Sequence, residues 1–452
     1  MKDRLRGALL ICLILAAGAV LGVLLLMAVY GIPVSKMADN YAASLESIES
    51  REGWHRYIEG YDISTLDNNT EFLMLKAAAT PMPSTGETFI QKVLRCYTYN
   101  DEWNHGMVFA QGEYNGESFT CDSYERYWHG YLVLLKPLLV LFTYQDLVYL
   151  NIVLQSALMF FLQKTLRKQG MEYMQIPFLI FWAASMQLVV MLSLDYSVCF
   201  YIYMFSVLLL LRFSKLRARY GLFFLGVGMV TSYMDLLTWP LVTLAVPLTV
   251  LLQCEGGTLK RTEASKSFKS LESLKSLESL ESFQGIKKVV AASFAWGTGY
   301  AVQWAAKWLA ATLIMRDNVM KDAAASLLFR SALGEETLTW GRVIVKNLSV
   351  FYNMPCLLLG GILLLLIGIL LYRYRGKIKW GGMAPCLVVG IFPFLWYLVT
   401  RNHAYEHYWM TWRNLAVTVF AVCAGLSKCI FSKRENPRLY SRPRSGSRFF
   451  IL

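Results

Sequence analysis

Residues 220–253 read YGLFFLGVGMVTSYMDLLTWPLVTLAVPLTVLLQ, and this stretch decides the fold. Its length suits either one tilted membrane crossing or two short ones. A single crossing would place Asp235 near the middle of the bilayer, where an unpaired carboxylate is energetically unfavourable. Two crossings instead place Asp235 at a tight turn on the far surface. We therefore expect the chain to fold back on itself at Asp235.

The distribution of lysine and arginine favours the same interpretation. Basic residues cluster at 2–6, 164–168, 212–219, 287–288, 373–379 and 428–448. Cytoplasmic loops of membrane proteins are enriched in these residues. Two crossings within 220–253 put every cluster on the cytoplasmic side, whereas one crossing exports the last three. Both chain termini are then predicted to be cytoplasmic.

Composition places the chain among helical membrane proteins. Of its 452 residues, 56% are hydrophobic, and the mean hydropathy is +0.40. Residues 8–30 are 23 positions without a charge, too long for the core of a cleaved signal peptide, so we expect a retained helix. The sequence predicts an all-α polytopic membrane protein of about ten transmembrane helices, with a mixed extracytoplasmic loop domain after the first helix. The predicted spans are residues 8–30, 147–166, 174–192, 196–211, 220–234, 236–252, 289–314, 350–372, 383–400 and 411–430.

The predicted organisation follows from these spans. It runs as a first transmembrane helix (1–30), an extracytoplasmic loop domain (31–130), an interfacial or re-entrant helix (131–145), transmembrane helices two to six (146–254), a cytoplasmic low-complexity loop (255–288), transmembrane helix seven (289–314), a second extracytoplasmic loop (315–349), transmembrane helices eight to ten (350–430) and a basic cytoplasmic tail (431–452).

The charge of the protein is divided between the two sides of the membrane. The loop domain holds 15 acidic and 7 basic residues, a net charge of 7 − 15 = −8, while the whole chain carries +13. The basic excess therefore belongs to the cytoplasmic loops and tail, where it would meet anionic lipid headgroups. Membrane lipids are the expected partners. The sequence contains no nucleic-acid-binding motif, so we expect no nucleic-acid partner.

Two local patterns bear on the loops. Residues 267–283 read SFKSLESLKSLESLESF, a three-residue period that fits neither a helix nor a strand. We therefore expect a low-complexity insert that is disordered or loosely bound to the surface. Cys96 and Cys121 share the outer loop, where an oxidising exterior would allow a disulfide, and the sequence leaves their pairing open.

The histidines all fall on the outer side in this topology. They are His55, His105, His129, His403 and His407. His403 and His407 are four residues apart, so on a helix they would share a face and hold a metal or a phosphate. The alternative is that they anchor the segment at the interface beside Tyr405 and Trp409. Arg401 and Arg413 lie nearby, and arginine forks suit a lipid-linked phosphate.

Acidic residues near the outer membrane edge are the candidates for proton transfer. Asp62, Asp67 and Glu71 lie in EGYDISTLDNNTE, while Asp195 and Asp235 lie at the ends of predicted spans. A general base must lie close to the hydroxyl that it deprotonates. Solvated surface charge is the alternative for any acid in a loop. The candidate catalytic residues are Asp62, Asp67, Asp195 and Asp235.

Several segments together resemble the GT-C superfamily of integral-membrane glycosyltransferases, and also a group of uncharacterised multi-spanning proteins of Gram-positive bacteria. These segments are an N-terminal span followed by a large acidic outer loop, RYWHGY (126–131), Asp195, SYMDLLTWP (232–240) and NHAYEHYWMTWRN (402–414). The resemblance implies transfer of a sugar from a polyprenyl-phosphate carrier on the outer face, with an acid of the first outer loop as base. Some members use a divalent metal ion, whose ligands here are unassigned. The adjacent acidic pair usual after the first span is missing, so the base is unassigned as well.

Three functions fit the sequence. As a glycosyltransferase of the bacterial cytoplasmic membrane, the protein would transfer a sugar to a cell-envelope acceptor. Asp62 or Asp67 would deprotonate the acceptor, and Asp195 and Asp235 would bind a metal ion or the sugar. The candidate substrate-binding residues are then Arg126, His129, Arg401, His403, His407 and Arg413, with Trp54, Trp103 and Trp128 stacking on sugar rings. The second function is transport or flipping of a polar or lipid-linked envelope precursor. The third is that of a noncatalytic membrane scaffold.

Overall fold

The computed structural model describes residues 2–49, 53–99, 121–254, 271–332, 338–376, 378 and 380–431. About 80% of the structure is helical, which confirms the all-α class. Five segments are long and apolar enough to cross a membrane: Leu5–Tyr30, Tyr144–Lys168, Leu194–Arg212, Met354–Tyr374 and Tyr408–Phe431. Three shorter helices are also apolar: Tyr220–Met234, Leu241–Cys254 and Ala384–Val399. Helices of this length and composition match a bilayer core, so the chain has the character of a helical membrane protein.

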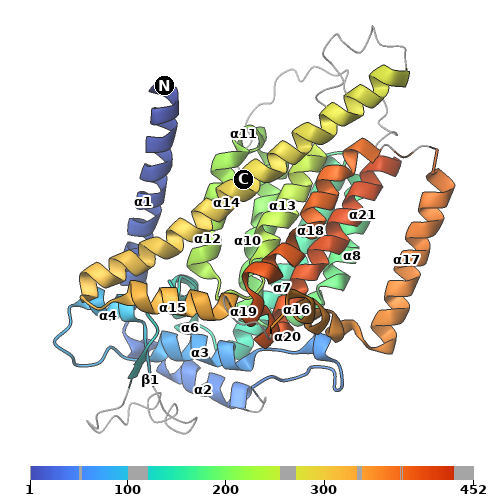
Figure 1. Ribbon diagram of the computed structural model, residues 1–452. Helices are drawn as coiled ribbons and strands as arrows, with labels where there is room; N and C mark the ends of the chain where they lie inside the picture. The colour runs from blue at the N-terminus through green and yellow to red at the C-terminus, as the bar shows by residue number, and fades with distance from the viewer. Residues whose placement is uncertain are drawn as a thin grey trace, which may run out of the picture.

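The helices form a bundle with a second layer across one end (Figure 1). The bundle consists of α1 (Lys2–Tyr30), α7 (Tyr144–Lys168), α8 (Gln175–Ala184), α9 (Gln187–Met191), α10 (Leu194–Arg212), α12 (Tyr220–Met234), α13 (Leu241–Cys254), α14 (Leu271–Met315), α17 (Met354–Tyr374), α18 (Ala384–Val399) and α21 (Ala416–Phe431). Helices α1 and α17 stand at the two edges of the bundle, and the short α11 (Ser214–Ala218) lies at the same end as the N-terminus.

The end layer contains short helices and a small sheet. Its helices are α2 (Ala38–Glu49), α3 (Asn68–Ala79), α4 (Phe89–Arg95), α6 (Leu132–Leu139), α15 (Val319–Ser331), α16 (Trp340–Leu348), α19 (Arg401–Glu406) and α20 (Tyr408–Thr411). Strands β1 (Tyr97–Tyr99) and β2 (Cys121–Ser123) pair antiparallel with Tyr97 opposite Ser123. Among the described residues, six 3₁₀ turns connect elements of the end layer and of the bundle: Val34–Lys36, Asp62–Ser64, Glu172–Met174, Ser349–Phe351, Trp380–Gly382 and Trp412–Leu415. Segments that the sequence assigned to the first and to the late outer loops therefore occupy one layer (Figure 1).

Residues 220–253 do fold back at Asp235. Helix α12 ends at Met234 and α13 begins at Leu241. The Asp235 carboxylate accepts hydrogen bonds from the Thr238 backbone N–H at 3.2 Å and from the Thr238 hydroxyl at 2.6 Å. Such a side-chain cap favours a turn over continued helix.

Helices α12 and α14 approach each other at two glycines. A Cβ atom on Gly228 would lie 2.1 Å from the Trp296 carbonyl oxygen, and one on Gly299 would lie 2.1 Å from the Leu225 carbonyl oxygen. Small residues let helix backbones approach closely in membrane proteins. These two glycines therefore set the crossing of α12 over α14.

The low-complexity loop differs from its sequence expectation. It is helical from Leu271 onward, because α14 begins there, so the expectation of a disordered insert is wrong for residues 271–288. Leucine, glutamate and lysine propagate a helix readily once an adjoining apolar segment has nucleated it. Cys96 and Cys121, whose pairing the sequence left open, are both free thiols in the structure. Residues 100–120, 255–270 and 432–452, including His105 and Trp103, lie outside the described residues.

Candidate functional site

Two helix N-termini meet where the end layer touches the bundle. Asp67 caps α3 by accepting a hydrogen bond from the Thr70 N–H at 3.0 Å. Ser193 caps α10 by accepting from the Tyr196 N–H at 3.1 Å. Glu71 and Asp195 then lie in the first turns of these two helices, where the helix dipole favours negative charge.

Glu71 and Asp195 contact each other through Ser193. The Ser193 hydroxyl oxygen lies 2.8 Å from Glu71 Oε1 and 2.7 Å from Asp195 Oδ1. The Asp195 backbone N–H also donates to Glu71 Oε1 at 2.8 Å. Both side chains are only 2% exposed. Burial raises the pKa of Glu71 from 4.5 to about 7, against the opposing effect of the hydrogen bonds that it accepts.

A buried guanidinium lies beside this pair. Arg413 is 0% exposed and donates from Nη1 to the Trp409 carbonyl oxygen at 2.8 Å. Its Cζ atom lies 4.2 Å from the centre of the Tyr196 ring, a cation–π distance. Within the described residues, Arg413 Nε and Nη2 have no hydrogen-bond partner. The charge of Asp195 attracts this guanidinium.

The two late histidines face each other at the same place. Their ring centres are 4.7 Å apart, and His403 Nε2 lies 2.9 Å from the Leu237 carbonyl oxygen in the α12–α13 turn. Burial lowers the pKa of His403 and of His407, and Arg330 adds to the effect on both. Both imidazoles are therefore neutral at pH 7, and neither Nδ1 has a hydrogen-bond partner in the part of the chain described.

Asp235 joins the turn to the centre of the bundle. It is buried, and Cys199 Sγ of α10 donates to its Oδ1 at 3.3 Å. Burial raises the pKa of this carboxyl, against the hydrogen bonds from Thr238 and Cys199. Asp235 and Asp195 therefore both face the interior, between the end layer and the bundle.

Aromatic side chains cover the outer side of the cluster. Trp409 Nε1 donates to Asp67 Oδ2 at 3.2 Å, and its ring centre lies 5.4 Å from that of Trp54. Trp54 is exposed. The cluster is therefore separated from solvent by Trp409, with an exposed aromatic ring above it.

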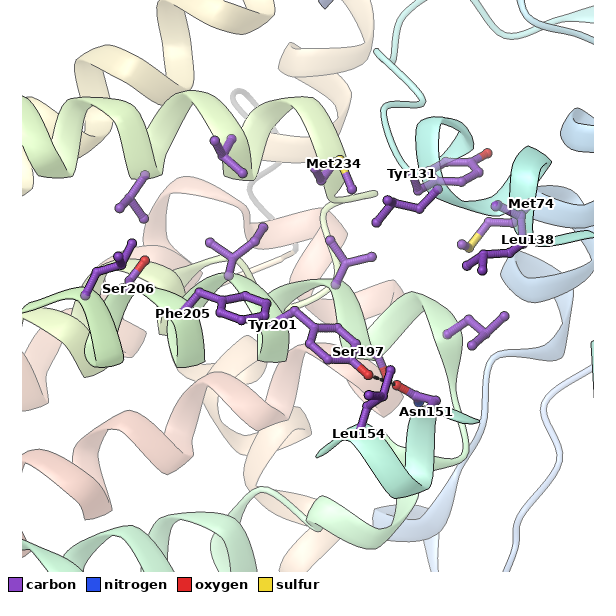
Figure 2. Close-up of a pocket in the computed structure, with 18 of the residues that line it drawn as sticks. Met74, Tyr131, Leu138, Asn151, Leu154, Ser197, Tyr201, Phe205, Ser206 and Met234 are labelled. Atoms are coloured by element: carbon purple, nitrogen blue, oxygen red, sulfur yellow. Dashed lines mark hydrogen bonds between the residues drawn. The ribbon is translucent and has the colours of Figure 1, made fainter. Parts of the chain in front are cut away.

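An apolar cavity of about 840 Å³ adjoins the cluster (Figure 2). Its walls come from α6, α7, α10 and α12. Tyr131, Leu138 and Met74 lie at one end and Ser206 toward the other (Figure 2). Lining residues on α10 run from Leu194 to Leu209, about 22 Å of helix at 1.5 Å per residue.

The cavity meets the polar cluster along two helices. Leu194 and Ser197 line it on either side of Asp195, and Met74 lines it one turn after Glu71. An apolar space thus lies beside the buried carboxyl groups, which belong to the same helices but are not among its lining residues. This combination suits a ligand with a hydrocarbon part and a polar part.

The structure gathers six of the ten residues that the sequence predicted as site residues. They are Asp67, Asp195, Asp235, His403, His407 and Arg413. Glu71 and Ser193 join them without having been assigned a role. The pairing of Glu71 with Asp195 spans 124 residues, so no local pattern could indicate it. The one available signal was the spacing of Asp67 and Glu71 at the start of a helix.

The other four predicted residues make different contacts. Asp62 lies at the rim, in an exposed ion pair with Arg56 at 2.6 Å. Arg126 forms an ion pair with Asp322 at 2.9 Å. Arg401 donates to the Ala332 carbonyl oxygen at 3.0 Å, at the C-terminal end of α15.

The fourth is His129, which is buried between the Tyr124 carbonyl oxygen and the Tyr131 hydroxyl. Burial lowers its pKa to about 3, so it packs as a neutral ring. Trp128, expected to stack on a sugar, is also buried and donates to the Gln303 carbonyl oxygen at 2.7 Å. Neither side chain is open to a ligand in this conformation.

A metal site was left open by the sequence. Among the described residues, no group of three or more histidine, cysteine, aspartate or glutamate side chains is arranged to hold a metal ion.

Comparison of the chain with protein families, with curated proteins and with solved structures finds no match.

Proposed function

We propose that the protein is a membrane glycosyltransferase of the GT-C type, which transfers a sugar from a polyprenyl-phosphate donor to a cell-envelope acceptor. The observation that carries this proposal is that the apolar cavity, lined by Leu194 and Ser197, lies next to the buried polar cluster around Asp195. The cavity suits the hydrocarbon chain of the donor, and the cluster suits its polar headgroup.

The unpartnered atoms of the cluster have the chemistry that a sugar headgroup requires. Glu71 Oε2 and Asp195 Oδ2 are acceptors without a partner in the described chain, and Arg413 offers two unpartnered nitrogens. Buried polar atoms are almost always paired in native proteins. Hydroxyl groups of a sugar would donate to the carboxyl oxygens and accept from the guanidinium.

The roles within this proposal differ from those expected from sequence. Both oxygens of Asp67 are engaged, one by the α3 cap and one by Trp409. Glu71 and Asp195 each keep an unpartnered oxygen among the described residues, so the proposal assigns the general base to this pair. Arg413 is the cation for the donor phosphate, because Arg401 is occupied at the end of α15 and both histidines are neutral.

The proposed location is the bacterial cytoplasmic membrane, with the end layer outside and both termini inside. The basic clusters of the sequence support this orientation. The N-terminus and α11, which carries Lys215 and Arg217, lie at the end of the bundle opposite α3 and α19 (Figure 1).

Transport of a lipid-linked precursor is the second candidate. Its support is a break between α8 and α9, where Met186 adopts a left-handed conformation with φ of 52°. Discontinuous helices are frequent at the substrate sites of transporters. Gln187 of α9 donates to Gln155 of α7 at 2.6 Å, so a buried polar network stabilises the break between α8 and α9.

One experiment separates these functions. Purified protein in lipid nanodiscs is incubated with radiolabelled polyprenyl-phosphate sugar and a mixture of envelope acceptors, and the release of product is measured. We expect turnover by the wild type and by Asp322→Asn, a surface control. Glu71→Gln and Asp195→Asn should lower kcat by roughly 10²- to 10⁴-fold, the usual contribution of a general base. Absence of turnover together with saturable uptake in vesicles would establish the transporter instead.

A further inference from the structure

The contacts of Ser193 require a proton that the ionised side chains cannot supply. A serine hydroxyl has one hydrogen to donate. Its oxygen lies within hydrogen-bond distance of two carboxyl oxygens, Glu71 Oε1 and Asp195 Oδ1. If both carboxyls were ionised, one of these short contacts would join two acceptors without a hydrogen between them. One carboxyl must therefore donate to the serine oxygen.

The hydrogen bonds through Ser193 can run in either direction, and both directions require one proton on the pair of carboxyl groups. In one arrangement Asp195 donates to Ser193, and Ser193 donates to Glu71. The other arrangement reverses both donors. The first fits the backbone better, because Glu71 Oε1 already accepts from the Asp195 N–H at 2.8 Å.

The charges around the pair also favour one proton on the two carboxyl groups. The titratable and charged groups that act on the pair from neighbouring elements are Asp67, Tyr144, Tyr196, Asp235 and Arg413. Of these, Arg413 is fully buried with two nitrogens unpartnered among the described residues, and it balances one negative charge. A second ionised carboxylate would be buried next to Asp67 and Asp235 without a matching cation, which is strongly unfavourable.

We propose that Glu71, Ser193 and Asp195 form a single proton-binding site that holds one proton between two carboxyl groups at neutral pH. One carboxyl is then a proton donor and the other a proton acceptor at the same pH, as in other buried carboxyl pairs. Two side chains thus provide both an acid and a base. This inference concerns the ligand-free protein, and it holds whether or not the protein transfers a sugar.

The test is infrared spectroscopy of the purified full-length protein in nanodiscs without substrate. A protonated carboxyl gives a C=O stretch that is separate from the carboxylate bands and shifts in D₂O. We expect this band in the wild type at pH 7, and its loss in both Glu71→Gln and Asp195→Asn. Removing either partner leaves one carboxyl beside the buried Arg413 guanidinium, which balances it as a carboxylate, so the pair no longer has to hold a proton. Asp322→Asn, which alters an exposed ion pair, should retain the band.

Three results would overturn the proposal. Absence of the band in the wild type means that no proton is held. Its survival in Glu71→Gln or in Asp195→Asn means that the remaining carboxyl keeps a proton of its own. Its survival in the double variant means that the proton resides elsewhere.

The wild type alone provides a second readout that does not depend on the folding of variants. Titration should remove the band in one single-proton step with its midpoint above that of a free carboxyl. A two-proton titration would contradict the proposal. Ser193→Ala should shift the band and Ser193→Thr should restore it, since the hydroxyl transmits the hydrogen bond; no shift in Ser193→Ala would exclude the serine from the site.

Discussion

The Thr231 and Thr243 hydroxyl oxygens are hydrogen bonded at 2.8 Å across the turn between α12 and α13. The two residues lie on either side of Asp235, so the contact requires the helices to run antiparallel. Trp296 of α14 also donates to the Thr243 hydroxyl at 3.1 Å. Hydrogen bonds among α12, α13 and α14 thus stabilise the turn at which the chain reverses direction.

This reversal predicts the accessibility of segments on both sides of it. In a background without the nine native cysteines, Ser84→Cys and Lys321→Cys should react with a membrane-impermeant maleimide in intact cells. Lys215→Cys and Gln284→Cys should react only after the membrane is opened, because their helices end on the other side. Labelling of position 284 from outside would show that residues 220–253 cross once.

The close approach of α12 and α14 predicts which glycines tolerate a methyl group. Gly228→Ala and Gly299→Ala each place a Cβ 2.1 Å from a backbone oxygen, so the helices must separate. We expect a loss of about 1–3 kcal/mol in stability, as for other overpacked contacts, measured as a lower thermal midpoint. The controls Gly221→Ala and Gly297→Ala meet nothing within 4 Å and should leave the midpoint unchanged or slightly raised. Equal effects in all four variants would contradict the crossing.

The apolar cavity predicts a site where added volume blocks a lipid ligand. Gly226 lines the cavity, and no atom lies within 4 Å of the position that a Cβ atom would take there. Gly226→Trp should fill the space and lower the affinity for polyprenyl-phosphate sugar at least roughly 10-fold, which corresponds to about 1.4 kcal/mol. Gly221→Trp lies on the same helix but outside the cavity lining and should bind normally. Equal affinity of the two variants would mean that the hydrocarbon chain of the ligand binds outside this cavity.

The sequence predicted much of the fold because its strongest signals are local. Apolar blocks of membrane length and the placement of lysine and arginine indicate spans and the turn at Asp235 without any tertiary information. The repeat at 267–283 was misleading for its described part, residues 271–283, because a helix needs propensity and a nucleus rather than an apolar face.

The candidate site was predictable only in part. Membrane-edge acids and the HxxxH spacing indicated Asp195, Asp235, His403 and His407. Arg401 and Arg413 are equivalent by sequence, yet one caps α15 and the other lies buried beside Asp195. Only their tertiary contacts, with the end of α15 for Arg401 and with Tyr196 of α10 for Arg413, distinguish them. Glu71 belongs to the site because it contacts Ser193, which lies 122 residues away in the sequence, so no local pattern indicated it.

The proton shared by Glu71 and Asp195 predicts a pH dependence of stability. The pKa of Glu71 is raised from 4.5 to about 7 in the folded protein, so the folded state binds the proton more tightly than the unfolded state. The resulting stabilisation is fully present below pH 4.5 and is lost as the pH rises toward 7. It amounts to roughly 3 kcal/mol, since one pKa unit equals about 1.4 kcal/mol.

Thermal unfolding of the wild type and Glu71→Gln between pH 4.5 and 8 measures this effect. The glutamine cannot ionise, so its midpoint should change less with pH and should exceed that of the wild type most at pH 8. Asp322→Asn should follow the wild type at every pH. If Glu71→Gln also follows the wild type, the pair of Glu71 and Asp195 takes up no proton in this pH range in the folded protein, and burial between α3 and α10 does not hold one there.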